Sequence, residues 1–162
     1  MNHNIKPYQA DDVYLHKLVN YKDLFEIIFD NIKFDSVCEI GIETGEFSSI
    51  LEDYIKDGVI KEYHGVDVCI TKKIGFNSHY HEMTSLEYLT SEEHLGHDLY
   101  LVDGDHNYYT VTAELENIFS AASGKKSASC MILTGLAAVV TFIIILLRSR
   151  RRPLTHYHGI RN

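Results

Sequence analysis

Cysteine is scarce in this chain, and its positions form no recognisable pair. The three cysteines, Cys38, Cys69 and Cys130, stand in no Cys-x-x-Cys motif, so we expect neither a cysteine-based zinc site nor a redox-active pair. The chain also begins without the basic, apolar and small-residue segments of a signal peptide. We therefore expect reduced thiols and a cytoplasmic location. Its 162 residues are enough for one domain whose core needs no disulfide.

Both ends of the sequence lack acidic residues. All 23 acidic residues lie between Asp11 and Glu116, and the last 46 residues contain none. All five arginines lie at or after Arg148. Residues 1–116 hold eight lysines and a net charge of −15, whereas the remaining residues carry +7. Such an acidic segment repels phosphates, so we expect no nucleic-acid partner, and the abrupt change indicates a boundary.

Apolar residues recur at helical spacing in some segments and in short continuous runs in others. This pattern predicts helices over residues 11–33, 47–55 and 107–119, with a short one through Leu86 and Leu89. It predicts strands over residues 36–40, 63–68, 80–83 and 99–102. Because strands alternate with helices, we expect successive strands to be parallel in a doubly wound α/β sheet.

A glycine loop follows the first predicted strand, in the run Glu39-Ile40-Gly41-Ile42-Glu43-Thr44-Gly45. Asp67 ends the next strand, where a carboxylate can accept hydrogen bonds from both ribose hydroxyls of a nucleotide. Glu43 stands where a dinucleotide motif has its middle glycine, and its charge would repel a pyrophosphate at the helix start. The pattern therefore favours a nucleoside without phosphates, such as S-adenosylmethionine, over NAD. An ordinary strand–loop–helix turn is the alternative.

An aspartate-rich turn, Val-Asp-Gly-Asp-His-Asn-Tyr, covers residues 102–108 at the end of the last predicted strand. Ligands of open α/β sheets bind at this edge. Asp103 is a hard oxygen ligand suited to Mg²⁺, and His106 can act as a general base near neutral pH. A simpler interpretation is that Asp105 or Asn107 caps the following helix, and we expect this of one of them.

Together these motifs resemble the class I S-adenosylmethionine-dependent methyltransferases. The aspartate-rich turn is similar to that of the methyltransferase 24 group, which includes macrocin-type sugar O-methyltransferases and cephalosporin-hydroxylase-like proteins. The resemblance covers about residues 36–121 and implies O-methylation of a small hydroxylated or sugar-like substrate. It implies that Asp103 is the metal or substrate ligand and that His106 is the catalytic base. It also implies cofactor contacts for these residues: Glu39, Gly41 and Gly45 along the methionine half, Asp67 at the ribose, and Thr84 and Ser85 near the adenine.

The resemblance implies an incomplete doubly wound, Rossmann-like parallel sheet with an N-terminal helix and an apolar C-terminal segment. We divide the chain into an N-terminal helical region (1–35), a partial methyltransferase-like domain (36–123) and an apolar segment with a basic tail (124–162). The oligomeric state stays open. Four further histidines share no ligand spacing and are predicted to be surface or loop groups: His79, His81, His94 and His97.

The apolar segment has two interpretations. Cys130 to Leu147 is uncharged, and four arginines follow within five residues. Residues 129–147 are long enough for a minimal transmembrane helix, which would make the chain a single-pass, catalytically inactive, membrane-anchored nucleoside-binding module. The arginine end would then face the cytoplasm and leave the methyltransferase-like residues on the other side, away from the cofactor. The alternative is a reading-frame error after about residue 121, which would leave the fourth strand without its neighbour.

The reading-frame hypothesis makes a testable prediction about the gene. The resembling family continues with an apolar strand ending in His-Asp and then with Trp-Pro-x-Gly-Arg-Arg-Asp, and the chain has neither run. Codons for Cys130–Ile132 can spell His-Asp in an offset frame, and codons for Thr134–Thr141 can spell Trp-Pro-Cys-Gly-Arg-Arg-Asp in the same frame. We expect the DNA sequence to show both, and codons that spell neither would leave the transmembrane helix as the better account.

Overall fold

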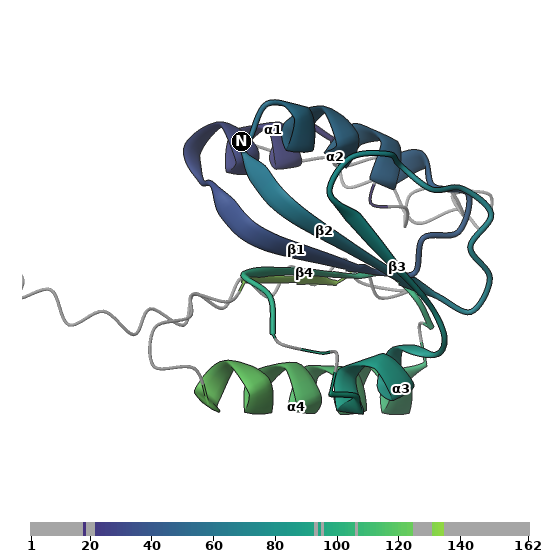
Figure 1. Ribbon diagram of the computed structural model, residues 1–162. Helices are drawn as coiled ribbons and strands as arrows, with labels where there is room; N and C mark the ends of the chain where they lie inside the picture. Colours follow the sequence, from purple (N-terminus) through teal and green to yellow (C-terminus); the bar gives the residue numbers. More distant parts are fainter. Residues whose placement is uncertain are drawn as a thin grey trace, which may run out of the picture.

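The computed structural model describes residues 18, 22–92, 94, 96–105, 107–124 and 131–134 (Figure 1). Its elements follow in the order α1 (Lys22–Asn31), β1 (Phe34–Ile40), α2 (Glu46–Lys56), β2 (Ile60–Asp67), β3 (Ser78–Glu82), α3 (Ser85–Thr90), β4 (Leu99–Val102), α4 (Tyr108–Gly124) and β5 (Met131–Thr134).

The five strands form one parallel sheet in the order β3-β2-β1-β4-β5. Helices α1 and α2 cover one face of this sheet, and α3 and α4 cover the other (Figure 1). The strand order reverses between β1 and β4, which is where open α/β sheets bind ligands beyond the carboxyl ends of their strands. The predicted doubly wound, Rossmann-like parallel sheet is confirmed.

Each face of the sheet has its own apolar core. On the α1/α2 face, Phe25 and Phe47 pack with ring centroids 4.5 Å apart above the buried side chain of Val37. On the α3/α4 face, Cys38 and Tyr100 pack with Ile118. All four residues of β4 are buried, because a central parallel strand is covered on both sides. This explains why the run Leu-Tyr-Leu-Val predicts β4 with its observed bounds.

Several other elements differ from the prediction at their ends. The helix predicted over 11–33 is present as α1, while its expected cap at Asp11 or Asp12 lies outside the described residues. Strand β2 begins at Ile60, three residues before its predicted start, and Ile60 pairs with Phe34. The prediction missed this start because the exposed Lys61 and Glu62 interrupt the apolar pattern. Helix α4 continues to Gly124, through small residues that carry little periodic signal.

Strand β5 corrects the expectation for the end of the sheet. Met131–Thr134 pairs with β4 in parallel, from Leu99 opposite Met131 to Val102 opposite Thr134. The expectation that β4 lacks a neighbour is therefore wrong, and so is a helix running unbroken through residues 129–147. Within the described part of the chain, no helix is long and apolar enough to cross a membrane. Residues 135–162 lie outside it, and the reading-frame hypothesis stays a prediction.

Gly41 brings the carboxyl ends of β1 and β4 together. Its φ is +88°, and a Cβ at this position would lie 2.5 Å from the carbonyl oxygen of Asp103 and 2.6 Å from Cα of Gly104. The Gly41 N–H donates to the carbonyl of Val66 at 2.9 Å, and the Asp103 N–H donates to that of Ile40 at 2.8 Å. Three strand ends are thus held within backbone contact of one another.

Replacing Gly41 with alanine should therefore destabilise the fold by more than its positive φ alone would. Gly58 is the matched control, because its φ is +70° but a Cβ there would meet nothing within 4 Å. We expect Gly58→Ala to cost about 1 kcal/mol for the left-handed conformation, and Gly41→Ala to cost a further 1–3 kcal/mol or so for overpacking. Urea unfolding of both variants measures this difference, and equal losses would contradict the close approach.

Candidate functional site

A cavity of about 800 Å³ opens at the carboxyl edge of the sheet, at the reversal between β1 and β4. Its walls come from the ends of β1, β2 and β4 and from the starts of α2 and α3. The apolar part of the lining includes Ile40, Phe47, Val66, Met83 and Leu86. The cavity also gathers most of the site residues that the sequence predicts: Glu39, Gly41, Asp67, Thr84, Ser85 and Asp103.

Charge in this cavity has one sign. The described residues that line it include no lysine or arginine. They include six acidic residues: Glu39, Glu43, Glu46, Asp67, Asp103 and Asp105. Such a field favours cations and hydrogen-bond donors and disfavours phosphate groups. The repulsion of phosphate groups that the sequence predicts from Glu43 alone is thus expected of the whole cavity.

Asp67 holds the glycine loop in place. Its Oδ2 accepts hydrogen bonds from the backbone N–H groups of Ile42 at 2.7 Å and Glu43 at 3.0 Å, and its Oδ1 accepts one from Cys69 at 3.1 Å. Glu43 has a φ of +51°, a conformation that a side chain disfavours and that surrounding bonds must maintain. The Thr71 hydroxyl adds such a bond by donating to the Glu43 carbonyl at 3.1 Å.

Glu39 is a buried acid at the base of the cavity, only 1% exposed. Its Oε2 accepts hydrogen bonds from the hydroxyls of Ser48 at 2.7 Å and Tyr63 at 2.5 Å. Burial, opposed by the hydrogen bonds from the two hydroxyls and helped by the nearby carboxylates of Asp103 and Asp67, raises the pKa of Glu39 to about 7. At neutral pH this group therefore stands near the midpoint of its titration and responds to any charge that enters the cavity.

The aspartate-rich turn is divided between the cavity and a helix cap. Asp103 Oδ2 accepts the backbone N–H of Leu18 at 3.4 Å, and Leu18 lines the cavity as well. Asn107 accepts the Tyr109 N–H at 2.9 Å, so the expected cap of the following helix is confirmed for Asn107. His106, the predicted base, lies outside the described residues.

Two predicted cofactor contacts have local structural roles. Gly45 caps the start of α2 with a φ of +72° and is not among the residues that line the cavity. The Thr84 hydroxyl takes part in a capping box with Glu87 at the start of α3, so its contribution to a ligand site would come from the backbone. Ser85 follows it in the wall.

The described residues give little to the predicted Mg²⁺ site. Asp103 supplies one carboxylate, and the described group of three side chains that could hold a metal lies elsewhere, on β2 and β3. Mg²⁺ is usually bound by one or two carboxylates together with water molecules. Mg²⁺ at Asp103 therefore stays a prediction.

Sequence reasoning missed a cluster of histidines on the α3/α4 side of the sheet. The His64 ring stacks on that of His79 with centroids 4.7 Å apart. The His97 ring is tilted against it, with centroids 4.5 Å apart, and His64 Nδ1 lies 3.3 Å from His81 Nε2. The ring centroids of His94 and His97 lie 5.8 Å apart. His79 is exposed and His94 and His97 lie between elements, as predicted, whereas His81 is half-buried on β3. The prediction missed that these rings lie together. Alternation along neighbouring strands, as Glu-x-His and His-x-His, was the signal that could have revealed the cluster.

Comparison with known proteins supports the fold and leaves the family open. No family model matches the chain and no curated protein matches it. Among solved structures, it is similar to the N-methyltransferase NodS from Bradyrhizobium japonicum WM9 in complex with S-adenosyl-L-homocysteine, at 16% identity and a TM-score of 0.51. The two proteins share a Rossmann-like fold. The match covers 80% of this chain and 66% of that protein.

A second structure of NodS matches at 17% identity and a TM-score of 0.49, over 68% of this chain and 64% of that one. The chain thus spans slightly less than two thirds of the length of the methyltransferase that it matches.

Glu39 gives the stability of this methyltransferase-like fold a distinctive pH dependence. Its folded-state pKa of about 7 exceeds the ordinary value of 4.5. At a pH between these two values, Glu39 is therefore protonated in the folded state and ionised in the unfolded state. Acidification through this window should stabilise the fold by about 3 kcal/mol through Glu39. In Glu39→Gln this contribution should disappear.

Urea unfolding of wild type and Glu39→Gln between pH 7.5 and pH 4.5 measures the effect as a difference. His64 acts in the opposite direction, because burial lowers its pKa to about 4, but it is present in both proteins and cancels. A difference in unfolding free energy that stays constant over this range would show that Glu39 is ionised in the folded state throughout.

Proposed function

We propose that this chain is an S-adenosylmethionine-dependent methyltransferase domain. The observation that carries the proposal is the acidic cavity at the strand reversal, whose described lining has six carboxylates and no basic side chain. When bound, S-adenosylmethionine supplies an activated methyl group on a sulfonium, and it carries an ammonium besides. Both charges suit this field, whereas the phosphates of NAD or ATP do not.

The placement of the lining supports a particular orientation of the cofactor. Glu39, at the base of the cavity, would face the cationic methionine half. Asp67 keeps acceptor capacity for ribose hydroxyls beyond the three amide hydrogen bonds it already accepts, because an ionised carboxylate has about four lone-pair sites. The apolar Val66, Met83 and Leu86 would enclose the adenine, beside Thr84.

For the acceptor we propose a small hydroxylated or sugar-like molecule. Asp103, at the end of β4, would bind the acceptor hydroxyl, and His106 would take its proton as the carbon–oxygen bond forms and the carbon–sulfur bond breaks. Positioning and deprotonation carry the catalysis in such a displacement. The position of Asp103 in the cavity lining supports its role. The choice of an oxygen acceptor rests on the resemblance of the aspartate-rich turn to that of the methyltransferase 24 group.

Binding of S-adenosyl-L-homocysteine tests the cofactor site. We expect Asp67→Ala to weaken the affinity by about 1–3 kcal/mol, since the variant loses a hydrogen-bond acceptor for the ligand and the anchor of the loop. Calorimetry on wild type and variant measures this loss. Binding of NADH in preference to S-adenosylmethionine would overturn the proposed function.

Asp98 is the matched control for this experiment. Its Oδ2 also accepts two backbone N–H groups, from Asp35 at 2.8 Å and Ser36 at 3.2 Å, but at the opposite edge of the sheet. Asp98→Ala therefore removes the same kind of anchor without touching the cavity, and it should leave the affinity unchanged. Equal losses in both variants would mean that Asp67 acts only through the stability of the fold.

Turnover tests the proposed base. In a form of the protein that transfers methyl groups, His106→Ala should lower the rate by about 10²–10⁴-fold, as loss of a general base does, while cofactor affinity should barely change. Transfer of a radiolabelled methyl group to polyhydroxylated acceptors measures the rate. Normal turnover in the variant would exclude His106 as the base, and activity that survives exhaustive chelation would limit Asp103 to substrate binding.

A further inference from the structure

We propose that Glu62, His64 and His79 bind a divalent transition-metal ion such as Zn²⁺. This site is separate from the cofactor cavity, since none of the three residues lines it. The proposal does not depend on the proposed methyltransferase function. It rests on ligand geometry, on the support behind one ligand and on the position of the three residues in the sheet.

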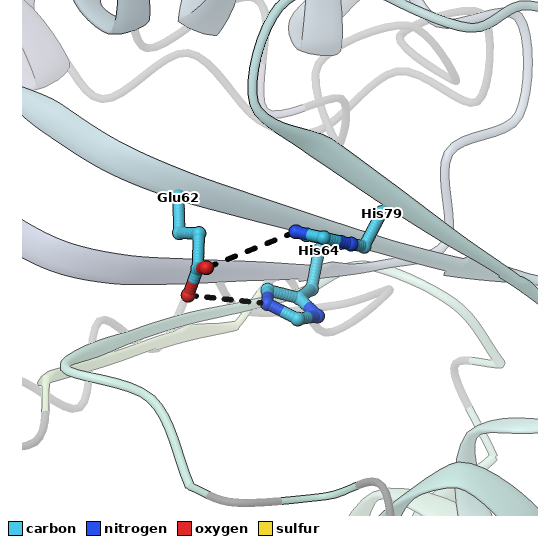
Figure 2. A group of neighbouring side chains, drawn as sticks. All are labelled: Glu62, His64 and His79. Atoms are coloured by element: carbon cyan, nitrogen blue, oxygen red, sulfur yellow. Dashed lines mark ion pairs between the residues drawn. The ribbon is translucent and has the colours of Figure 1, made fainter.

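The strand register places the three side chains on one face. Glu62 and His64 are two residues apart on β2, so their side chains project to the same side of the sheet. His79 on β3 is the register partner of His64. Figure 2 shows the carboxylate of Glu62 beside the two imidazole rings, with one ion pair to a nitrogen of each. The sheet itself therefore brings the three groups together.

The distances are close to those that a metal requires. Glu62 Oε2 lies 3.8 Å from His64 Nε2, and Glu62 Oε1 lies 3.8 Å from His79 Nε2 (Figure 2). The three ligand atoms all lie within 4.8 Å of one another. Ligands at Zn–N and Zn–O distances near 2.0 Å in a tetrahedral site stand about 3.3 Å apart. Small side-chain rotations of Glu62 and His79, which are 54% and 53% exposed, would close the gap.

The half-buried ligand, His64, is oriented from behind, as metal-bound histidines usually are. The second ring nitrogen of His64, Nδ1, lies 3.3 Å from His81 Nε2 and 3.5 Å from the Tyr88 hydroxyl. Tyr88 is fully buried, and its hydroxyl is hydrogen-bonded to His97 Nε2 at 2.8 Å. This network fixes the His64 ring with Nε2 toward Glu62.

The ligand set indicates the class of ion. Two imidazoles and one carboxylate suit Zn²⁺ and its neighbours in the first transition row, whereas Mg²⁺ and Ca²⁺ prefer oxygen ligands. Three protein ligands leave a fourth position for water. An ion held here would link β3, at the edge of the described sheet, to β2, and so would stabilise the strand that leads into the cavity wall at Met83.

Zinc titration of the full chain against a chromophoric chelator tests the site. We expect Glu62→Gln and His79→Ala to weaken Zn²⁺ binding by about 100-fold or more. His81→Ala should weaken it by about 10–100-fold, because the His64 ring loses a contact that orients it. Glu82→Gln is the matched control for Glu62→Gln, since it changes an exposed carboxylate on β3 outside the group. Its affinity should equal that of wild type.

Co²⁺ and thermal unfolding give independent readouts. Wild type and Glu82→Gln should give the visible absorption of a tetrahedral Co²⁺ complex and a higher Tm with Zn²⁺, whereas His79→Ala should show neither. Affinity for S-adenosyl-L-homocysteine should be the same in all these variants, which separates this test from that of the cofactor site. Equal Zn²⁺ affinity in wild type, Glu62→Gln and His79→Ala, or no binding below millimolar Zn²⁺, would overturn the proposal.

Discussion

The contact between the ends of β1 and β4 is the constraint on which the site depends. At Gly41 the chain passes so close to Asp103 that no side chain fits between them. This contact sets where the two strands diverge, and divergence at a strand reversal produces a crevice. The aspartate-rich turn then stands directly across from the glycine loop, so the residues proposed for the cofactor and those proposed for the acceptor line one cavity.

Electrostatics gives that space its character. Carboxylates from five separate elements and loops converge on a partly apolar cavity, where charges interact more strongly than in bulk water. The cost appears at Glu39, whose pKa rises to about 7 because a buried acid among other acids resists ionisation. A cation that enters would relieve this repulsion, so an acidic cavity that strains the free protein is complementary to a sulfonium ligand.

The sequence predicted local features well and cross-strand features poorly. Strand β4 could be recognised because its apolar run is continuous, and Asp67 because its distance from the glycine loop is characteristic of nucleotide folds. The anchoring bonds from Asp67 to Ile42 and Glu43 could not be predicted, since they depend on the approach of two strand ends. The same holds for the histidine cluster, whose members are separated by up to 33 positions between His64 and His97. Strand β5 was hidden within a uniformly apolar run that a helix would satisfy equally well.

The anchoring of the glycine loop by Asp67 has a consequence for how quickly a ligand can be captured. Loops that become ordered only on binding lose conformational freedom at that moment, and this loss weakens the complex and slows its formation. Here the amides of Ile42 and Glu43 are already fixed before any ligand arrives, so the ordering entropy belongs to folding. Association at this wall of the cavity should then be limited by diffusion rather than by rearrangement of the loop.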